Sequence, residues 1–247
     1  MTVEASVLLA VESATVRASV AVVDRDSRVL EEAATQGGRH HSETLLPLID
    51  SVLSQAGLAL EDLAAIAVST GPGAFTSLRI GVATVKGLCF GDGPPVVAIP
   101  TLAALAMTGQ EAIQDLAGRC LIPALDARRE EVYAAAYVSG EGSDSGARPQ
   151  PILEASVFRS EELAAALPQG GWLVGEGAEV VRKGLEEHAP GLFESITGAA
   201  CQPEARSVGR LGWQALEAGE QMDASVLIPR YVRRAEAEVQ RTAQRFE

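Results

Sequence analysis

The loop Gly71-Pro72-Gly73 is the part of the chain best suited to chemistry. Its two glycines permit backbone angles that are closed to other residues, and Pro72 between them restricts the loop. Thr76 and Ser77 follow as suitable hydroxyls for a helix N-cap. A loop of this kind offers backbone N–H groups to a phosphate or another anion. The alternative is a tight strand-to-helix turn that binds no ligand, because short glycine motifs are weak evidence.

The histidines and cysteines form no recognisable metal-binding or nucleophilic pattern. His40 and His41 stand near Glu43, but neighbouring helical residues point about 100° apart, so we interpret them as surface or cap residues. The three cysteines are Cys89, Cys120 and Cys201. Their wide spacing, odd number and lack of a CxxC pattern argue against a disulfide framework and a structural zinc site. No Cys/His pair or Ser/His/Asp set predicts proteolysis.

Composition narrows the class of protein. With 47% apolar residues in 247, the chain can bury a large core. Its formal net charge of −13 opposes an autonomous nucleic-acid binder, although local basic patches remain possible. The apolar run at 7–11 is too short for a leader peptide, and no later stretch approaches membrane-spanning length. We therefore expect a cytoplasmic protein without membrane contact.

The first third of the chain predicts three strands followed by a helix. The apolar run at 7–11 is typical of a strand covered on both faces, and two β-rich segments after it predict an antiparallel meander. Apolar residues then recur at helical spacing over 40–56, with Gly57 as a C-terminal stop. Pro47 favours a start near Ser42 or Thr44, which would place the proline in the first turn.

The helix expected at 74–90 has two different sides. Its apolar stripe consists of Leu78, Val82, Val85 and Cys89. A stripe of small residues at similar spacing consists of Ala74, Ser77, Gly81 and Thr84. Glycine inside a helix costs about 1 kcal/mol relative to alanine, so Gly81 and Gly87 indicate close approach by another backbone, from this chain or from a second protein.

Alternation of strands and helices continues to about residue 218, and the remainder is expected to be extended and then solvated. A strand at 96–99 precedes an alanine-rich helix with Thr101 as its cap. Residues 120–127 and 132–138 predict a second antiparallel start. Ser207 and Gly219 are a suitable cap and stop for a last helix. The intervening elements are expected at 160–167 (helix), 172–174 (strand) and 178–188 (helix).

Five sequence blocks resemble those of the TsaB (YeaZ) family, in the same order along the chain. They lie at 10–14, 41–47, 71–81, 126–133 and 229–233. The resemblance implies an α/β fold of the duplicated actin, sugar-kinase and Hsp70 ATPase (ASKHA) type. It implies a first lobe at 1–108 completed by a helix at about 206–221, a second lobe at 109–205 and a tail at 228–247.

The resemblance also implies a function and partners. TsaB proteins are non-catalytic subunits of the bacterial machinery that forms N6-threonylcarbamoyladenosine at tRNA position 37. They bind and activate the catalytic paralogue TsaD, join TsaE and tRNA in a larger complex, and pair with themselves when TsaD is absent. The implied interface residues are Leu45, Leu48, Val52, Ala74, Ser77, Gly81 and Thr84. No catalytic residue, cofactor or metal is expected, because 101–107 lacks the histidine pair that holds the metal of TsaD.

Two other functions compete with this one. The superfamily's nucleotide site would fall on Glu12, Ser13, Thr15, Gly71 and Gly73. Glu12 replaces the more usual aspartate, which suggests a degenerate cleft, but an autonomous ATP-dependent transferase or ATPase that uses this loop, with Asp126 as a second acid, is the alternative. A direct tRNA-binding module would use Arg230, Arg233, Arg234 and Arg241.

Overall fold

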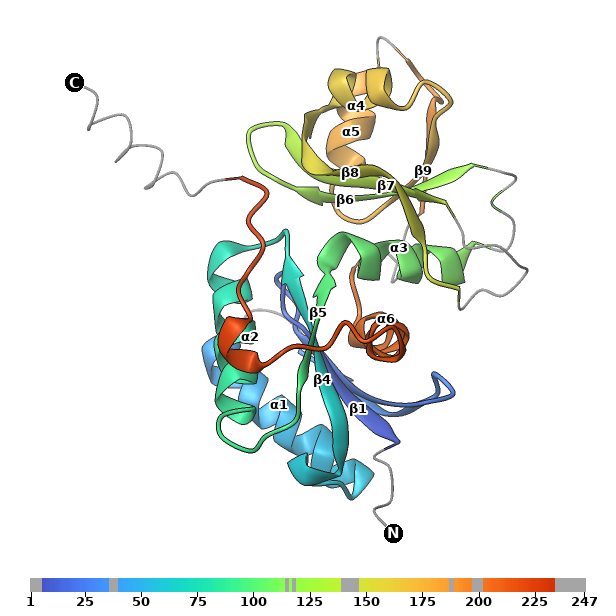
Figure 1. The fold of residues 1–247 in the computed structure, drawn as a ribbon. Coiled ribbons are helices and arrows are strands. Elements are labelled where there is room, and N and C mark those ends of the chain that lie inside the picture. Colours follow the sequence, from blue (N-terminus) through green and yellow to red (C-terminus); the bar gives the residue numbers. More distant parts are fainter. Residues whose placement is uncertain are drawn as a thin grey trace, which may run out of the picture.

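Two five-stranded sheets form the framework of the computed structural model, one in each lobe (Figure 1). The structure describes residues 6–35, 40–113, 116, 119–138, 147–186, 189–196 and 202–233. The first sheet contains β1 (Val7–Glu12), β2 (Ser19–Asp24), β3 (Val29–Ala34), β4 (Leu63–Gly71) and β5 (Val96–Pro100). The second contains β6 (Cys120–Asp126), β7 (Glu131–Val138), β8 (Gln150–Arg159), β9 (Gly171–Val174) and β10 (Phe193–Ser195).

The two sheets have the same topology. The first runs β3-β2-β1-β4-β5 and the second runs β8-β7-β6-β9-β10. In each sheet, the first three strands in chain order form an antiparallel meander. The fourth strand then pairs in parallel with the first, and the fifth pairs in parallel with the fourth. This repetition confirms the duplicated two-lobe α/β architecture that the sequence predicts.

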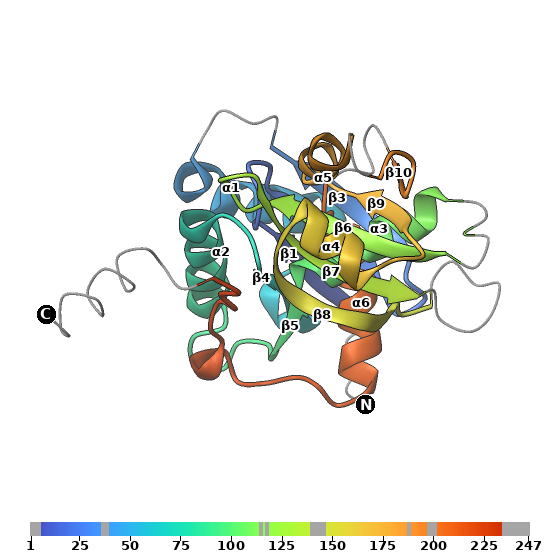
Figure 2. The same ribbon diagram turned by 90° about the horizontal axis from the view of Figure 1, so that it is seen from above.

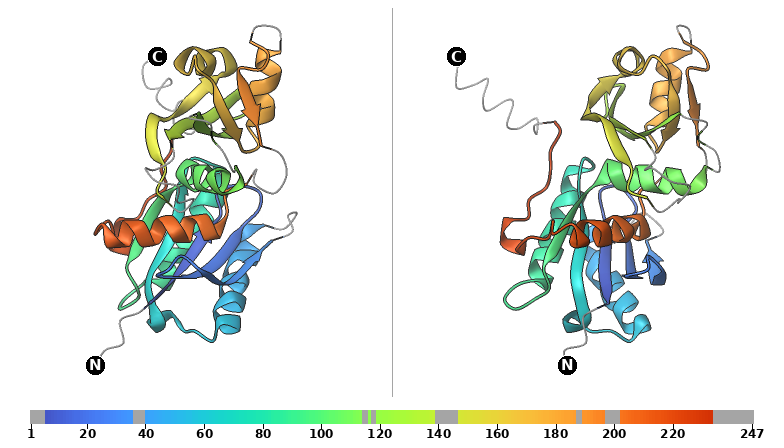
Figure 3. Two further views of the ribbon diagram at one scale, coloured as in Figure 1. Left: turned by 90° about the vertical axis from the view of Figure 1, so that its right-hand side faces the viewer. Right: turned by 45° about the vertical axis from the view of Figure 1, so that its right-hand side comes forward.

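The first sheet is covered on both faces by helices (Figures 1 and 3). Leu9 and Val11 of β1 pack with α1 (His41–Ala56) and α2 (Phe75–Leu88). The intervening residues Leu8 and Ala10 pack on the opposite face, toward α3 (Thr101–Ala112) and α6 (Ala205–Glu217). Since successive strand residues point to opposite faces, the uninterrupted apolar run of β1 follows from its central position.

Helix α3 lies between the two sheets (Figure 1). Ala104 and Met107 belong to the core of the first lobe, whereas Leu102 and Leu105 pack with Leu121 and neighbouring residues of the second. The outer face of the second sheet carries α4 (Ser160–Ala166) and α5 (Ala178–Leu185). Two short 3-10 turns, η1 (Leu60–Asp62) and η3 (Ala224–Val226), complete the described elements. None of the described helices has both the length and the apolar character needed to cross a membrane.

Several helix starts differ from the sequence-based predictions. Helix α1 begins at His41, so Pro47 lies in its second turn and leaves the carbonyl of Glu43 without its usual helical N–H partner. Helix α2 is preceded by Ala74 as its N-cap, and Thr76 and Ser77 fall within the first turn. No described side chain caps either helix.

The other two predicted caps are also wrong. Thr101 is the first residue of α3, and its hydroxyl accepts a hydrogen bond from the Gly71 N–H at 3.0 Å. Ser207 lies inside α6, where its hydroxyl shares a hydrogen bond with Thr108 at 2.9 Å. The stops at Gly57 and Gly219 are confirmed, since both have left-handed backbone angles at φ 68° and 76°.

Candidate functional site

The Gly71–Gly73 loop joins β4 to α2 and is enclosed by two other segments of the chain. A Cβ atom on Gly71 would lie 2.5 Å from the carbonyl oxygen of Arg230, and φ is +120° at this residue. A Cβ atom on Gly73 would overlap the carbonyl oxygen of Ala14. Both glycines are therefore required by close backbone approach within the chain. We call residues 228–233, which close one side of this loop, the strap.

Several backbone donors around this loop already have partners within the chain. The Ala74 N–H donates to the carbonyl of Ala14 at 2.7 Å. The Ser13 N–H donates to the Ser69 hydroxyl at 3.3 Å. The strap adds a hydrogen bond from the Arg230 N–H to the carbonyl of Thr70 at 2.7 Å. Together with the bond from Gly71 to α3, these contacts commit the N–H groups of Ser13, Gly71 and Ala74 to folding.

Glu12 is an interior acid. Its side chain is fully buried at the end of β1, and Oε1 accepts a hydrogen bond from the Ala14 N–H at 2.6 Å. Oε2 has no partner among the described residues. Burial raises the Glu12 pKa to about 7, and the hydrogen bond from Ala14, with the nearby polar groups of Ser69 and Ser13, partly opposes this shift. Such a carboxyl is half protonated near neutral pH.

The predicted nucleotide-binding residues meet at one end of β1 and β4, but their polar groups face inward. Ser13 is fully buried and Thr15 is 4% exposed. The Thr15 hydroxyl donates to the carbonyl of Arg17 at 3.2 Å. The second candidate acid, Asp126, accepts hydrogen bonds from the backbone and side chain of Arg128 at 2.7 and 3.2 Å. The geometry therefore favours a structural role for these residues.

Gly81 packs against its own chain. A Cβ atom added there would overlap the Ser13 hydroxyl, whose Oγ donates to the carbonyl of Ser77 at 3.4 Å. Close approach at the small-residue stripe is thus intramolecular at Gly81. By contrast, a Cβ atom at Gly87 would meet nothing within 4 Å.

The predicted interface residues divide into interior and surface groups. Leu45 and Val52 are 0% and 1% exposed and belong to the core beneath α1, and Gly81 is also buried, so these three side chains pack within the chain. Leu48, Ser77 and Thr84 are half-buried, and Ala74 is exposed. Helices α1 and α2 pack side by side (Figure 2) and also expose Leu46 (53%) and Phe75 (40%), which the sequence analysis did not select.

The strap connects α2 to the second lobe. Arg79 of α2 donates from Nε to the Tyr231 hydroxyl at 2.9 Å, and its guanidinium lies 3.9 Å from the centre of the Phe75 ring. The Phe75 and Tyr231 ring centres are 5.1 Å apart. At the other end, Arg233 donates to the carbonyl of Ala127 at 3.1 Å and pairs with Glu131.

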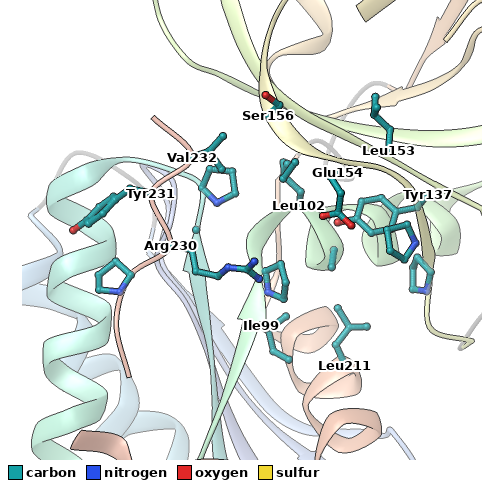
Figure 4. A pocket seen from close by; sticks show the side chains of 18 of the residues that line it. Ile99, Leu102, Tyr137, Leu153, Glu154, Ser156, Leu211, Arg230, Tyr231 and Val232 are labelled. Carbon is teal, nitrogen blue, oxygen red and sulfur yellow. The ribbon is translucent and has the colours of Figure 1, made fainter. Parts of the chain in front are cut away.

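The structure describes two of the four arginines that the tRNA-binding alternative would use, Arg230 and Arg233. Arg233 has its charge compensated by Glu131 on β7. The Arg230 side chain points into a cavity between the lobes (Figure 4). Arg234 and Arg241 lie outside the described residues, as does Cys201. Within the described ranges, no three His, Cys, Asp or Glu side chains gather as metal ligands.

Comparison with known proteins places the chain in a family. It matches the family model TsaD, described as tRNA N6-adenosine threonylcarbamoyltransferase, over residues 28–241. Its structure aligns with that of YeaZ from Pseudomonas aeruginosa with a TM-score of 0.75 and 31% identity, covering 92% of this chain and 99% of that one. The chain belongs to the TsaB (YeaZ) family.

Curated TsaB (YeaZ) relatives agree with this assignment. The tRNA threonylcarbamoyladenosine biosynthesis protein TsaB of Bacillus subtilis is 28% identical over 94% of this chain and 96% of its own length. The protein of the same name from Haemophilus influenzae is 37% identical over 51% of each chain. The match thus spans about half the length of the Haemophilus relative.

Proposed function

We propose that this chain is a non-catalytic scaffold subunit in the formation of N6-threonylcarbamoyladenosine at tRNA position 37, and that it binds and activates TsaD. The names of its TsaB relatives support the pathway. TsaE and tRNA join through the larger complex, and the free chain pairs with itself. The proposed location is the cytoplasm.

The observation that carries the non-catalytic role is the filled loop at the end of β4. Its glycines contact Ala14 and Arg230, and the Glu12 side chain is fully buried. An autonomous ATP-dependent enzyme would need a carboxylate and backbone donors that reach solvent. Calorimetry with Mg-ATP tests this alternative, and binding at micromolar concentration would contradict the proposal.

The outer surfaces of α1 and α2 supply the proposed docking site. Exposed Leu46 and Phe75 provide apolar contact, and Arg79 with Tyr231 adds residue types that are enriched where binding energy concentrates. Small exposed residues such as Ala74 and Ala83 allow a partner helix to approach. Shared use of this surface makes the self-pair and the TsaD complex mutually exclusive.

Co-elution with TsaD on a sizing column tests the docking site. Leu46→Asp on α1 and Ala83→Asp on α2 each place a charge in the proposed contact, and we expect the affinity to fall by at least about 30-fold, the equivalent of about 2 kcal/mol. Ile152→Asp on β8 is the matched control, because Ile152 is 54% exposed and Leu46 is 53% exposed. Undiminished co-elution of both helix variants would refute the site.

A further inference from the structure

A cavity of about 640 Å³ lies between the lobes, beside the strap. Ile99, Leu102 and Leu211 are among its apolar lining residues and are at most 2% exposed. Leu153 of β8 covers the opposite side (Figure 4). A volume of this size suits a small organic ligand, and the mixed polar and apolar lining favours one that has both kinds of group.

Two opposite charges enter the cavity from different walls. The Arg230 guanidinium projects from the strap, and the Glu154 carboxylate projects from β8 beside the Tyr137 ring (Figure 4). Neither charged group has a hydrogen-bond or ion-pair partner among the described residues. Both side chains are exposed and unpaired among the described residues, so both are available to a ligand.

Two other ionisable side chains at the cavity, Arg148 and Tyr137, add no uncompensated charge. Arg148, at the rim, makes two hydrogen bonds to the Glu220 carboxylate at 2.9 and 3.1 Å. Tyr137 is 7% exposed, and its pKa is raised to about 12 by burial and by Glu154, against the opposing effect of Arg230. Its phenol is therefore a neutral donor at physiological pH. Arg230 and Glu154 supply the charge recognition in this cavity.

We propose that this cavity binds a small aliphatic zwitterion, a free amino acid or a dipeptide. The ligand carboxylate would pair with Arg230 and the ligand ammonium with Glu154. The aliphatic side chain would lie against the half-buried Leu153 of β8. A simple anion satisfies only Arg230 and is repelled by Glu154, whereas a zwitterion satisfies both. Tyr231 lines this cavity and also belongs to the proposed docking surface, whereas Arg230 and Glu154 lie outside that surface.

Ligand-observed NMR titration of the full chain tests the site with four probes. L-leucine and glycyl-L-leucine carry both charges and distinguish an amino acid from a dipeptide. N-acetyl-L-leucine lacks the ammonium, and L-leucinamide lacks the carboxylate. Removing either charge should weaken binding by about tenfold or more, as expected for loss of a charge-assisted hydrogen bond.

Variants assign each charge to its partner. In Arg230→Gln the preference for L-leucine over L-leucinamide should vanish, and in Glu154→Gln the preference over N-acetyl-L-leucine should vanish. The strap should persist in Arg230→Gln, because Arg230 is attached to Thr70 through its backbone N–H. Arg28→Gln is the control, since Arg28 is 75% exposed in its side chain and lies outside the cavity.

Three results would overturn the proposal. The first is the absence of saturable binding of L-leucine or glycyl-L-leucine up to about 10 mM. A ligand that fails to saturate at this concentration has a binding free energy weaker than about 3 kcal/mol. The second is equal binding of N-acetyl-L-leucine, which would make the cavity a plain anion site. The third is unchanged discrimination in both cavity variants, which would place the ligand elsewhere.

Discussion

Replacing Glu12 by glutamine should change how the stability of the protein depends on pH. Glu12 is fully buried, and its pKa is raised from 4.5 to about 7 in the folded chain. Between these two values the folded state holds a proton that the unfolded state releases, so the free energy of unfolding falls as pH rises. Above about pH 7 both states are ionised and this contribution stays lost.

The size of the effect follows from the two pKa values. The difference between 4.5 and about 7, at about 1.36 kcal/mol for each pKa unit, corresponds to about 3 kcal/mol across the full interval. From about pH 5.5, safely above the isoelectric point of about 4.7, to about pH 8, we expect a loss of about 2 kcal/mol through Glu12. Glutamine does not ionise and removes this loss.

Urea unfolding of both proteins at these two pH values measures the effect. The quantity to compare is the change in the free energy of unfolding between the two pH values, because other titrating groups are common to both chains and cancel. One of these is His41, whose pKa burial lowers. Glu61→Gln removes an exposed carboxylate and gives the effect of the charge change alone. Parallel pH dependence in wild type and Glu12→Gln would refute the interior position of this acid.

Three further predictions concern the packing around α2. Gly81→Ala should lower the free energy of unfolding by about 1–3 kcal/mol, because the new methyl group overlaps the Ser13 hydroxyl. Gly87→Ala should raise the free energy of unfolding by about 0.5–1 kcal/mol, because alanine favours the helix and its methyl group meets nothing there. Equal urea midpoints for the two variants would contradict this prediction. Tyr231→Ala should release the strap, so limited proteolysis should cut there sooner with the urea midpoint nearly unchanged. Cys89, 7% exposed with a pKa raised to about 11 by burial and Asp223, should resist iodoacetamide at neutral pH until the chain unfolds, as mass spectrometry would report.

The sequence was sufficient to predict those parts of the fold that periodicity controls. The apolar run of β1 indicated a strand buried on both faces, and Gly57 marked the end of α1 through its left-handed backbone. The antiparallel start was visible twice, which is why the duplicated topology could be expected. Strand β8 was not predicted, because this edge strand has no buried face and so lacks a strong alternating pattern.

The candidate site was harder to predict, because spacing along a helix does not reveal what lies opposite it. Gly81 had the residue type expected for a partner contact, yet the neighbour it accommodates is Ser13, 68 positions earlier in the chain. The glycine loop had the composition of a phosphate cradle, and only the fold brings Arg230 against it. Both cases depend on contacts that are distant in sequence.

The position of α3 has a mechanical consequence for the whole molecule. Nine of its 12 residues are buried, because one side belongs to the core of the first lobe and another to the core of the second. Swinging the lobes apart would expose Leu102 and Leu105 to water, so the junction resists hinge motion. We therefore expect the two lobes to move as one unit, which would fix the orientation of the second lobe relative to a partner bound on α1 and α2.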